Sequence, residues 1–141
     1  MWGSGNEFKM STGFRDLVVW QRSMQLAVTV YDLTKHFPRE EIYGLTSQMR
    51  RSAVSIPSNI AEGQGRANPA EFRQFVSIAR GSNCELQTQL ELALALKLGD
   101  PASINSAQQL SEEVRKMLYG LISSLGQASK RITDLEPRTL N

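Results

Sequence analysis

Residues 68–98, NPAEFRQFVSIARGSNCELQTQLELALALKL, decide the fold class of this 141-residue chain. Asn68 is a good helix N-cap, Pro69 suits the first helical position, and Glu71 stands three residues after the cap, where its carboxylate can bond back. The spacing of three and four that follows predicts one amphipathic helix of about 30 residues, ending before Gly99. Its stripe is Phe72, Phe75, Ala79, Ser82, Leu86, Leu90 and Ala93.

Three more stripes of the same period predict three more helices, from Asp16 to Phe37, from Leu45 to Gly63, and from Pro101 to the Glu136-Pro137 pair. The first holds Leu17, Trp20, Met24, Ala27 and Tyr31; the second Leu45, Met49, Ala53, Ile56 and Ile60; the last Leu110, Val114, Met117, Leu121, Leu125, Ala128 and Ile132.

Four amphipathic helices without any sustained period-two alternation predict an all-α protein. Connectors of about three to nine residues make successive helices antiparallel, so we expect an up-down-up-down four-helix bundle with long helices. Pro57 removes a hydrogen bond and crowds the carbonyl of Ala53, which predicts a kink in the second helix at Pro57. We expect one domain over residues 14–135, a disordered leader or expression remnant over 1–13, and a flexible tail over 136–141.

The composition narrows the function classes only slightly. With 40% hydrophobic residues and one cysteine, the chain suits a single domain without disulfides, and we expect a cytoplasmic protein. Its net charge of +2 is too small to indicate a nucleic-acid partner. Apolar residues outside the main stripes indicate either a homo-oligomer or helices that bury a broad arc. These are Val18, Val19, Leu26, Val30, Leu33, Ile78, Leu92, Leu94 and Leu96.

No set of side chains predicts catalysis, a metal site or a cofactor. His36 and Cys84 stand on different predicted helices, without any spacing typical of metal ligands or a nucleophile. Residues 63–66, Gly-Gln-Gly-Arg, resemble a phosphate-binding turn only faintly, and Gly63 is better explained as a helix end. Glu85 is either a partly buried partner for an arginine of the second helix or a surface residue.

Five arginines are the candidate binding residues. Arg66, Arg73 and Arg80 recur every seven residues, a spacing that keeps side chains near one helix face, and Arg50 with Arg51 could extend this stripe. Between Arg50 and Arg80, five arginines against two glutamates give a local charge of +3. Arginines suit bidentate contacts with phosphates, but an ordinary solvated face with ion pairs to glutamates is the competing interpretation.

Four segments carry a resemblance to a known family. They are FRDLVVWQ at 14–21, GLTSQMRR at 44–51, SIPSNIAEG at 55–63, and the run from Ala79 to Leu86 that includes Glu85. Together they resemble the bacterial four-helix-bundle family of the 23S rRNA intervening-sequence proteins. The most specific run is 55–63, which contains Pro57, Asn59, Glu62 and Gly63. The resemblance covers about residues 14–99, and the fourth helix matches in pattern only.

The resemblance implies a homopentamer and contact with RNA. The similar accessory variability determinant of diversity-generating retroelements forms a five-fold barrel that binds a reverse transcriptase and nucleic acid through a basic surface. We therefore expect a non-enzymatic oligomeric helical scaffold that binds structured RNA or a nucleoprotein partner through its arginines. The alternative is a pure protein-interaction module whose arginines form ion pairs between subunits.

Overall fold

The computed structural model describes residues 13–135, which form four long helices, two short 3-10 turns and no strand. The all-α, four-helix architecture expected from the stripes is therefore confirmed. The elements are η1 (Gly13–Asp16), α1 (Val18–Thr34), η2 (Arg39–Glu41), α2 (Leu45–Gln64), α3 (Pro69–Ala95) and α4 (Pro101–Leu135).

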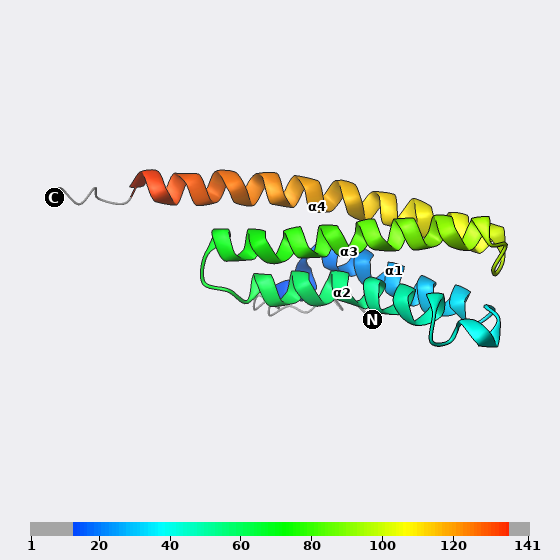
Figure 1. The fold of residues 1–141 in the computed structure, drawn as a ribbon. Helices are drawn as coiled ribbons and strands as arrows, with labels where there is room; N and C mark the ends of the chain where they lie inside the picture. Colours follow the sequence, from blue (N-terminus) through cyan, green and yellow to red (C-terminus); the bar gives the residue numbers. More distant parts are fainter. Residues whose placement is uncertain (1–12, 136–141) are drawn as a thin grey trace, which may run out of the picture.

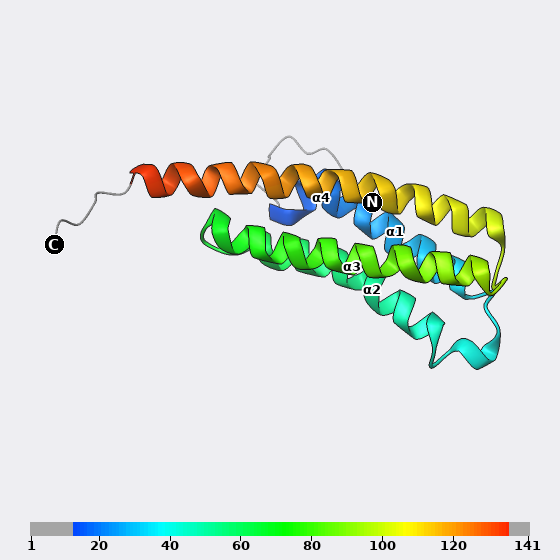
Figure 2. The same ribbon diagram turned by 45° about the horizontal axis from the view of Figure 1, so that its top comes forward.

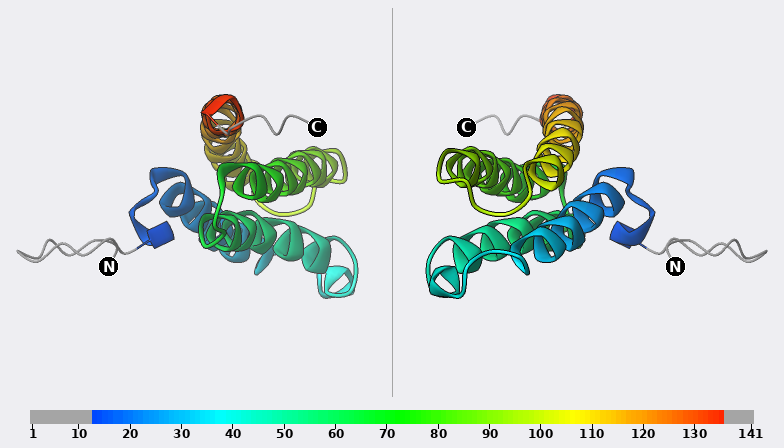
Figure 3. Two further views of the ribbon diagram at one scale, coloured as in Figure 1. Left: turned by 90° about the vertical axis from the view of Figure 1, so that its left-hand side faces the viewer. Right: turned by 90° about the vertical axis from the view of Figure 1, so that its right-hand side faces the viewer.

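The helices form a bundle with one helix at each corner (Figure 3). Helix α2 packs on α1 and α3, and α4 packs on the same two helices from the other side. The chain runs back and forth along one axis, and α4 extends beyond the other helices at its C-terminal end (Figure 1). Figure 2 shows the α1–α2 connector at the same end of the bundle as the α3–α4 connector.

The predicted starts of α3 and α4 are confirmed at atomic detail. The Asn68 side chain accepts a hydrogen bond of 2.9 Å from the backbone N–H of Glu71 and donates one of 3.0 Å to the Glu71 carboxylate. Asp100 accepts from the backbone N–H of Ser103 at 3.2 Å. Each side chain satisfies a backbone donor that the first helical turn leaves without an intrahelical partner.

The core confirms the stripe of α2 and corrects that of α1. All five predicted stripe residues of α2 are buried. In α1 the predicted cap was wrong, because Asp16 lies in η1 and the N-cap is Leu17. The α1 stripe is also rotated, with Tyr31 40% exposed and four residues predicted to lie off it buried in the core. These four are Val19, Leu26, Val30 and Leu33.

Those four residues therefore belong to the core of one subunit and give no indication of an oligomer. The expected kink stays a prediction: α2 continues as a helix through Pro57, which is buried. The expected leader and tail lie outside the described residues, except for Gly13, which begins η1. None of the helices within residues 13–135 is long and apolar enough to cross a membrane.

Candidate functional site

The run at 55–63 forms the contact between α2 and α3. Gly63 is buried and is the last but one residue of α2, so the helix end predicted at Gly63 is confirmed to within one residue. A β-carbon on Gly63 would stand 2.6 Å from the β-carbon of Phe75 and 2.9 Å from the ring of Phe72. The glycine is therefore needed because α3 approaches the α2 backbone too closely for any side chain.

Polar side chains of the same run form hydrogen bonds across this contact and beside it. The hydroxyls of Ser55 and Ser82 lie 2.8 Å apart and share a hydrogen bond between α2 and α3. Asn59 donates from its amide to the Ser55 carbonyl at 2.8 Å and to the Ser55 hydroxyl at 3.0 Å. Glu62 forms an exposed ion pair of 3.1 Å with Arg66. These residues thus act within one subunit.

Glu85 is a surface residue of α3 that lies level with Ser52 of α2 along the bundle axis. It accepts a hydrogen bond of 3.3 Å from the hydroxyl of Ser52. Within residues 13–135 it forms no ion pair, so the expectation of an arginine partner inside the subunit is not met. Its carboxylate lies at the outer edge of the α2–α3 contact.

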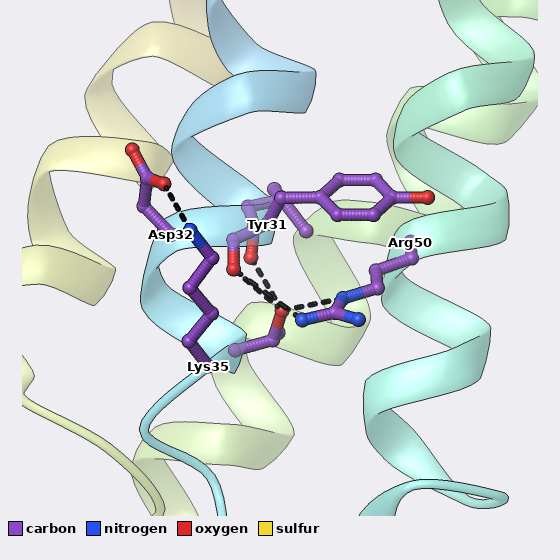
Figure 4. A network of polar contacts seen from close by, with 6 residues as sticks. Tyr31, Asp32, Lys35 and Arg50 are labelled. Carbon is purple, nitrogen blue, oxygen red and sulfur yellow. Dashed lines mark hydrogen bonds and ion pairs between the residues drawn. The ribbon is translucent and has the colours of Figure 1, made fainter.

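The Arg50 side chain links α2 to α1 through hydrogen bonds. Its Nε donates to the hydroxyl of Thr34 at 2.9 Å, and Nη2 lies 3.5 Å from the backbone carbonyl of Tyr31. Its guanidinium also stands 4.6 Å from the centre of the Tyr31 ring. Figure 4 shows it reaching from α2 toward the last turn of α1, beside the Asp32–Lys35 pair. A positive charge at this position is stabilised by the partial negative charge at the C-terminal end of α1.

Arg66 does not share a helix with Arg73 and Arg80. It precedes α3, so the seven-residue spacing applies only to the other two. Its guanidinium pairs with Glu62 and lies 4.9 Å from the centre of the Phe75 ring. Its charge is therefore largely balanced locally.

Arg73 and Arg80 are exposed on α3. Arg73 Nε donates to the backbone carbonyl of Ile122 in α4 at 3.3 Å. Neither arginine has a carboxylate partner among the ion pairs of the described residues. The structure thus separates the five arginines, with Arg50 on the α1 side of α2 and Arg73 on the α4 side of α3.

A groove between α1 and α2 is the feature that sequence reasoning missed. The cavity encloses about 690 Å³ and mixes three half-exposed apolar residues with two arginines. Because Tyr31 fitted the predicted stripe of α1, it was expected in the core. We call this surface the α1–α2 groove; it is lined by Tyr31, Ile42, Thr46, Ser47, Arg50, Arg51, Val54 and Ser55.

Residues with catalytic or metal-binding potential do not converge in the part of the chain that the structure describes. No group of three or more His, Cys, Asp or Glu side chains there could hold a metal ion. Cys84 is exposed. The described side chains therefore give no basis for assigning a reaction.

The 23S rRNA-intervening sequence protein family matches residues 15–120, which reach from η1 into the middle of α4. A solved structure similar to this chain is a protein of unknown function from the S23 ribosomal protein family of Bacteroides thetaiotaomicron. It has 26% sequence identity and a TM-score of 0.67, and the match covers 74% of this chain and 98% of that one. No curated protein matches the chain. Because the family match spans well over half of the residues, the chain belongs to the 23S rRNA-intervening sequence protein family.

Proposed function

We propose that this protein is a cytoplasmic, non-enzymatic helical scaffold that assembles from identical subunits, as the implied homopentamer, and binds structured RNA. The observation that carries the RNA part is the pair Arg73 and Arg80. Both are exposed, seven residues apart on α3, and without a carboxylate partner among the described residues. Such guanidinium groups can contact phosphates about 10 Å apart along the helix axis, at 1.5 Å of rise per residue.

The other arginines contribute less to this surface. Arg50 is bound to Thr34 and Tyr31, and Arg66 is paired with Glu62. Their hydrogen bonds must be broken before they can bind phosphate, which subtracts from any gain in affinity. The structure therefore supports Arg73 and Arg80 more strongly than the stripe of five that the sequence suggested.

The test is a gel-shift titration with fragments of 23S rRNA at increasing salt. We expect affinity to fall steeply with salt. Replacing both residues, Arg73→Ala with Arg80→Ala, should make the logarithmic slope shallower by about 1.5, because each phosphate that the protein neutralises contributes roughly 0.7–0.9 to that slope. The matched control is Arg22→Ala with Lys35→Ala, which removes the same charge from α1 and its C-cap. No binding at low salt, or equal slopes for both double variants, would overturn the RNA part of the proposal.

One observation favours the alternative of a protein-interaction module for two of the arginines. Arg50 and Arg51 line the α1–α2 groove beside Tyr31, Ile42 and Val54. An apolar floor flanked by charged side chains suits a protein partner better than a phosphate backbone. We therefore assign these two arginines to contacts between proteins and leave RNA to the α3 pair.

A further inference from the structure

The α1–α2 groove has a volume of about 690 Å³, and its lining points to a protein ligand. Tyr31, Ile42 and Val54 are 40%, 47% and 42% exposed, so a mainly apolar floor faces solvent. The charged residues of the lining are both arginines. A partner that fills the groove must therefore offer apolar side chains together with a carboxylate.

Thr46 adds a second indication that the groove is incomplete. Thr46 lines the groove and is 5% exposed. Its Oγ1 has no hydrogen-bond partner in the structure. Buried hydroxyl groups normally find a hydrogen-bond partner. A rotation of the Thr46 side chain toward the groove would allow a ligand seated there to supply one.

The outer face of α3 carries the complementary set. Ile78, Glu85 and Leu92 are each seven residues apart and so share one face, and Leu96 follows one turn later. Ile78, Leu92 and Leu96 are 53%, 46% and 55% exposed. We call these four residues the α3 ridge. It presents three apolar side chains and one carboxylate, which matches the chemistry that the groove lacks.

Groove and ridge also lie at the same height along the bundle. The Ser52–Glu85 and Ser55–Ser82 hydrogen bonds, at 3.3 Å and 2.8 Å, put the middle of α2 level with residues 82–85 of α3. Arg51 and Val54 are the sequence neighbours of those two serines. Arg50 and Arg51 are thus level with Glu85. The segment before α2, to which Ile42 belongs, lies at the same end of the bundle as the C-terminal end of α3, to which Leu92 and Leu96 belong (Figure 1).

The two surfaces lie on adjacent sides of the bundle. The groove opens between α1 and α2, the ridge runs along the α2 side of α3, and α2 lies between α1 and α3 (Figure 3). Equal heights mean that one subunit can be placed against the next by rotation without a shift along the axis. A contact between two different surfaces related in this way closes into a ring when the rotation between neighbours divides a full turn.

We propose that the α3 ridge of one subunit seats in the α1–α2 groove of the next, with Glu85 facing Arg50 and Arg51 and with Leu92 and Leu96 packed on Ile42. This inference rests on the self-assembly in the proposed function and names the two surfaces that carry it. Every subunit then uses both surfaces once. The RNA-binding pair Arg73 and Arg80 takes no part in the contact.

The first test is sedimentation velocity with apolar-to-charged variants at matched protein concentration. Leu92→Asp on the ridge and Val54→Asp in the groove are each expected to weaken association at least tenfold. The first buries a carboxylate against apolar Ile42, and the second removes an apolar contact and places a carboxylate beside Arg50 and Arg51, where it competes with the Glu85 carboxylate of the next subunit. Tyr119→Asp is the matched control, since Tyr119 is a 61% exposed aromatic residue on α4 outside both surfaces. Circular dichroism checks that every variant keeps its helices.

The second test is charge exchange between subunits. Arg51→Glu and Glu85→Arg are each expected to weaken assembly, because each places like charges close together. When the two variants are mixed, Glu at position 51 of one meets Arg at position 85 of the other, and assembly is expected to recover in part, because a five-membered ring can match at most four of its five contacts. A contact inside one subunit cannot be restored by mixing.

The outcomes separate the inference from the function beneath it. A wild-type chain that stays monomeric overturns the assembly part of the proposed function, and the inference with it. A wild-type oligomer that Leu92→Asp and Val54→Asp leave intact, or that recovers nothing on mixing, overturns the groove and ridge alone. Dissociation of these variants with an intact Tyr119→Asp control supports both.

Discussion

Helix α2 meets its two neighbours in opposite ways. Against α3 it is closed, because Gly63 lets the backbones approach and Ser55 bonds Ser82 across the contact. Against α1 it is open, and the long side chain of Arg50 bridges to Thr34 beside a groove. The specific run at 55–63 lies on the closed side, so it encodes packing within a subunit. The open side carries the groove that we propose as a contact between subunits.

The largest change in unfolding free energy is expected from a substitution at the closed contact between α2 and α3. Gly63→Ala places a β-carbon 2.6 Å from that of Phe75, and the rigid helix backbones cannot both yield, so we expect a decrease of about 2–3 kcal/mol in unfolding free energy. Urea denaturation measures it. Gly81→Ala is the matched control: nothing lies within 4 Å of its added carbon, and the higher helix propensity should stabilise α3 by about 1 kcal/mol. Equal effects at the two glycines would contradict a closed contact.

The second prediction distinguishes two neighbouring arginines on the open side. Arg50→Met removes the hydrogen bond to Thr34 and the guanidinium that faces the Tyr31 ring, for an expected cost of about 1–2 kcal/mol. Arg51→Met changes an exposed side chain and should stay within about 0.5 kcal/mol of wild type. Both are measured by urea denaturation at a protein concentration low enough for sedimentation velocity to show monomers, because assembly adds to apparent stability. A larger decrease at Arg51 would reverse the assignment of the two roles.

The contrast between the two sides also explains what the sequence could predict. Helices α2, α3 and α4 have strong local signals, such as the Asn68-Pro69 start. These signals depend on residues a few positions apart and not on how the helices pack, so they could be read from the sequence. Helix α1 has apolar residues at almost every phase, including Leu17, Val18, Val19 and Trp20. Spacing alone could not choose between the Tyr31 stripe and the Val30 stripe, because the choice depends on where α2 and α4 lie.

The candidate site was predictable only in part for the same reason. Arg50 and Arg51 are adjacent and chemically identical, yet only the position of α1 decides that Arg50 is committed and Arg51 exposed. The spacing of Arg66 from Arg73 fits a helix, but α3 begins at Pro69, after Arg66. Gly63 carried a signal for a helix end, while its close approach to Phe75 is a property of two helices together.

A smaller effect measures how much polar bonding adds to the closed side. Ser55→Ala and Ser82→Ala, singly and together, form a double-mutant cycle across the 2.8 Å contact. We expect a coupling energy of about 0.5–1 kcal/mol, because the bond is between neutral groups and only part-buried. Zero coupling would mean that the Ser55–Ser82 hydrogen bond adds nothing to the packing between α2 and α3.

The smallest effect is expected from a contact that joins no two helices. Within α4, a hydrogen bond from Arg115, aided by its charge, lowers the pKa of the exposed Glu112 carboxyl, with the two groups 2.6 Å apart. Because the pKa is lower in the folded state, ionised Glu112 stabilises the folded protein at pH values above the pKa of an unfolded glutamate, about 4.3. That stabilisation disappears as the pH falls through the folded-state pKa. Glu112→Gln should therefore remove a slight loss of stability in acid and change little at neutral pH, because water screens the exposed pair. Urea denaturation of both proteins across the acid range measures the difference. A drop in acid stability as large as the effect of Gly63→Ala would show that contacts within one helix rival those between helices, against the order argued from α2.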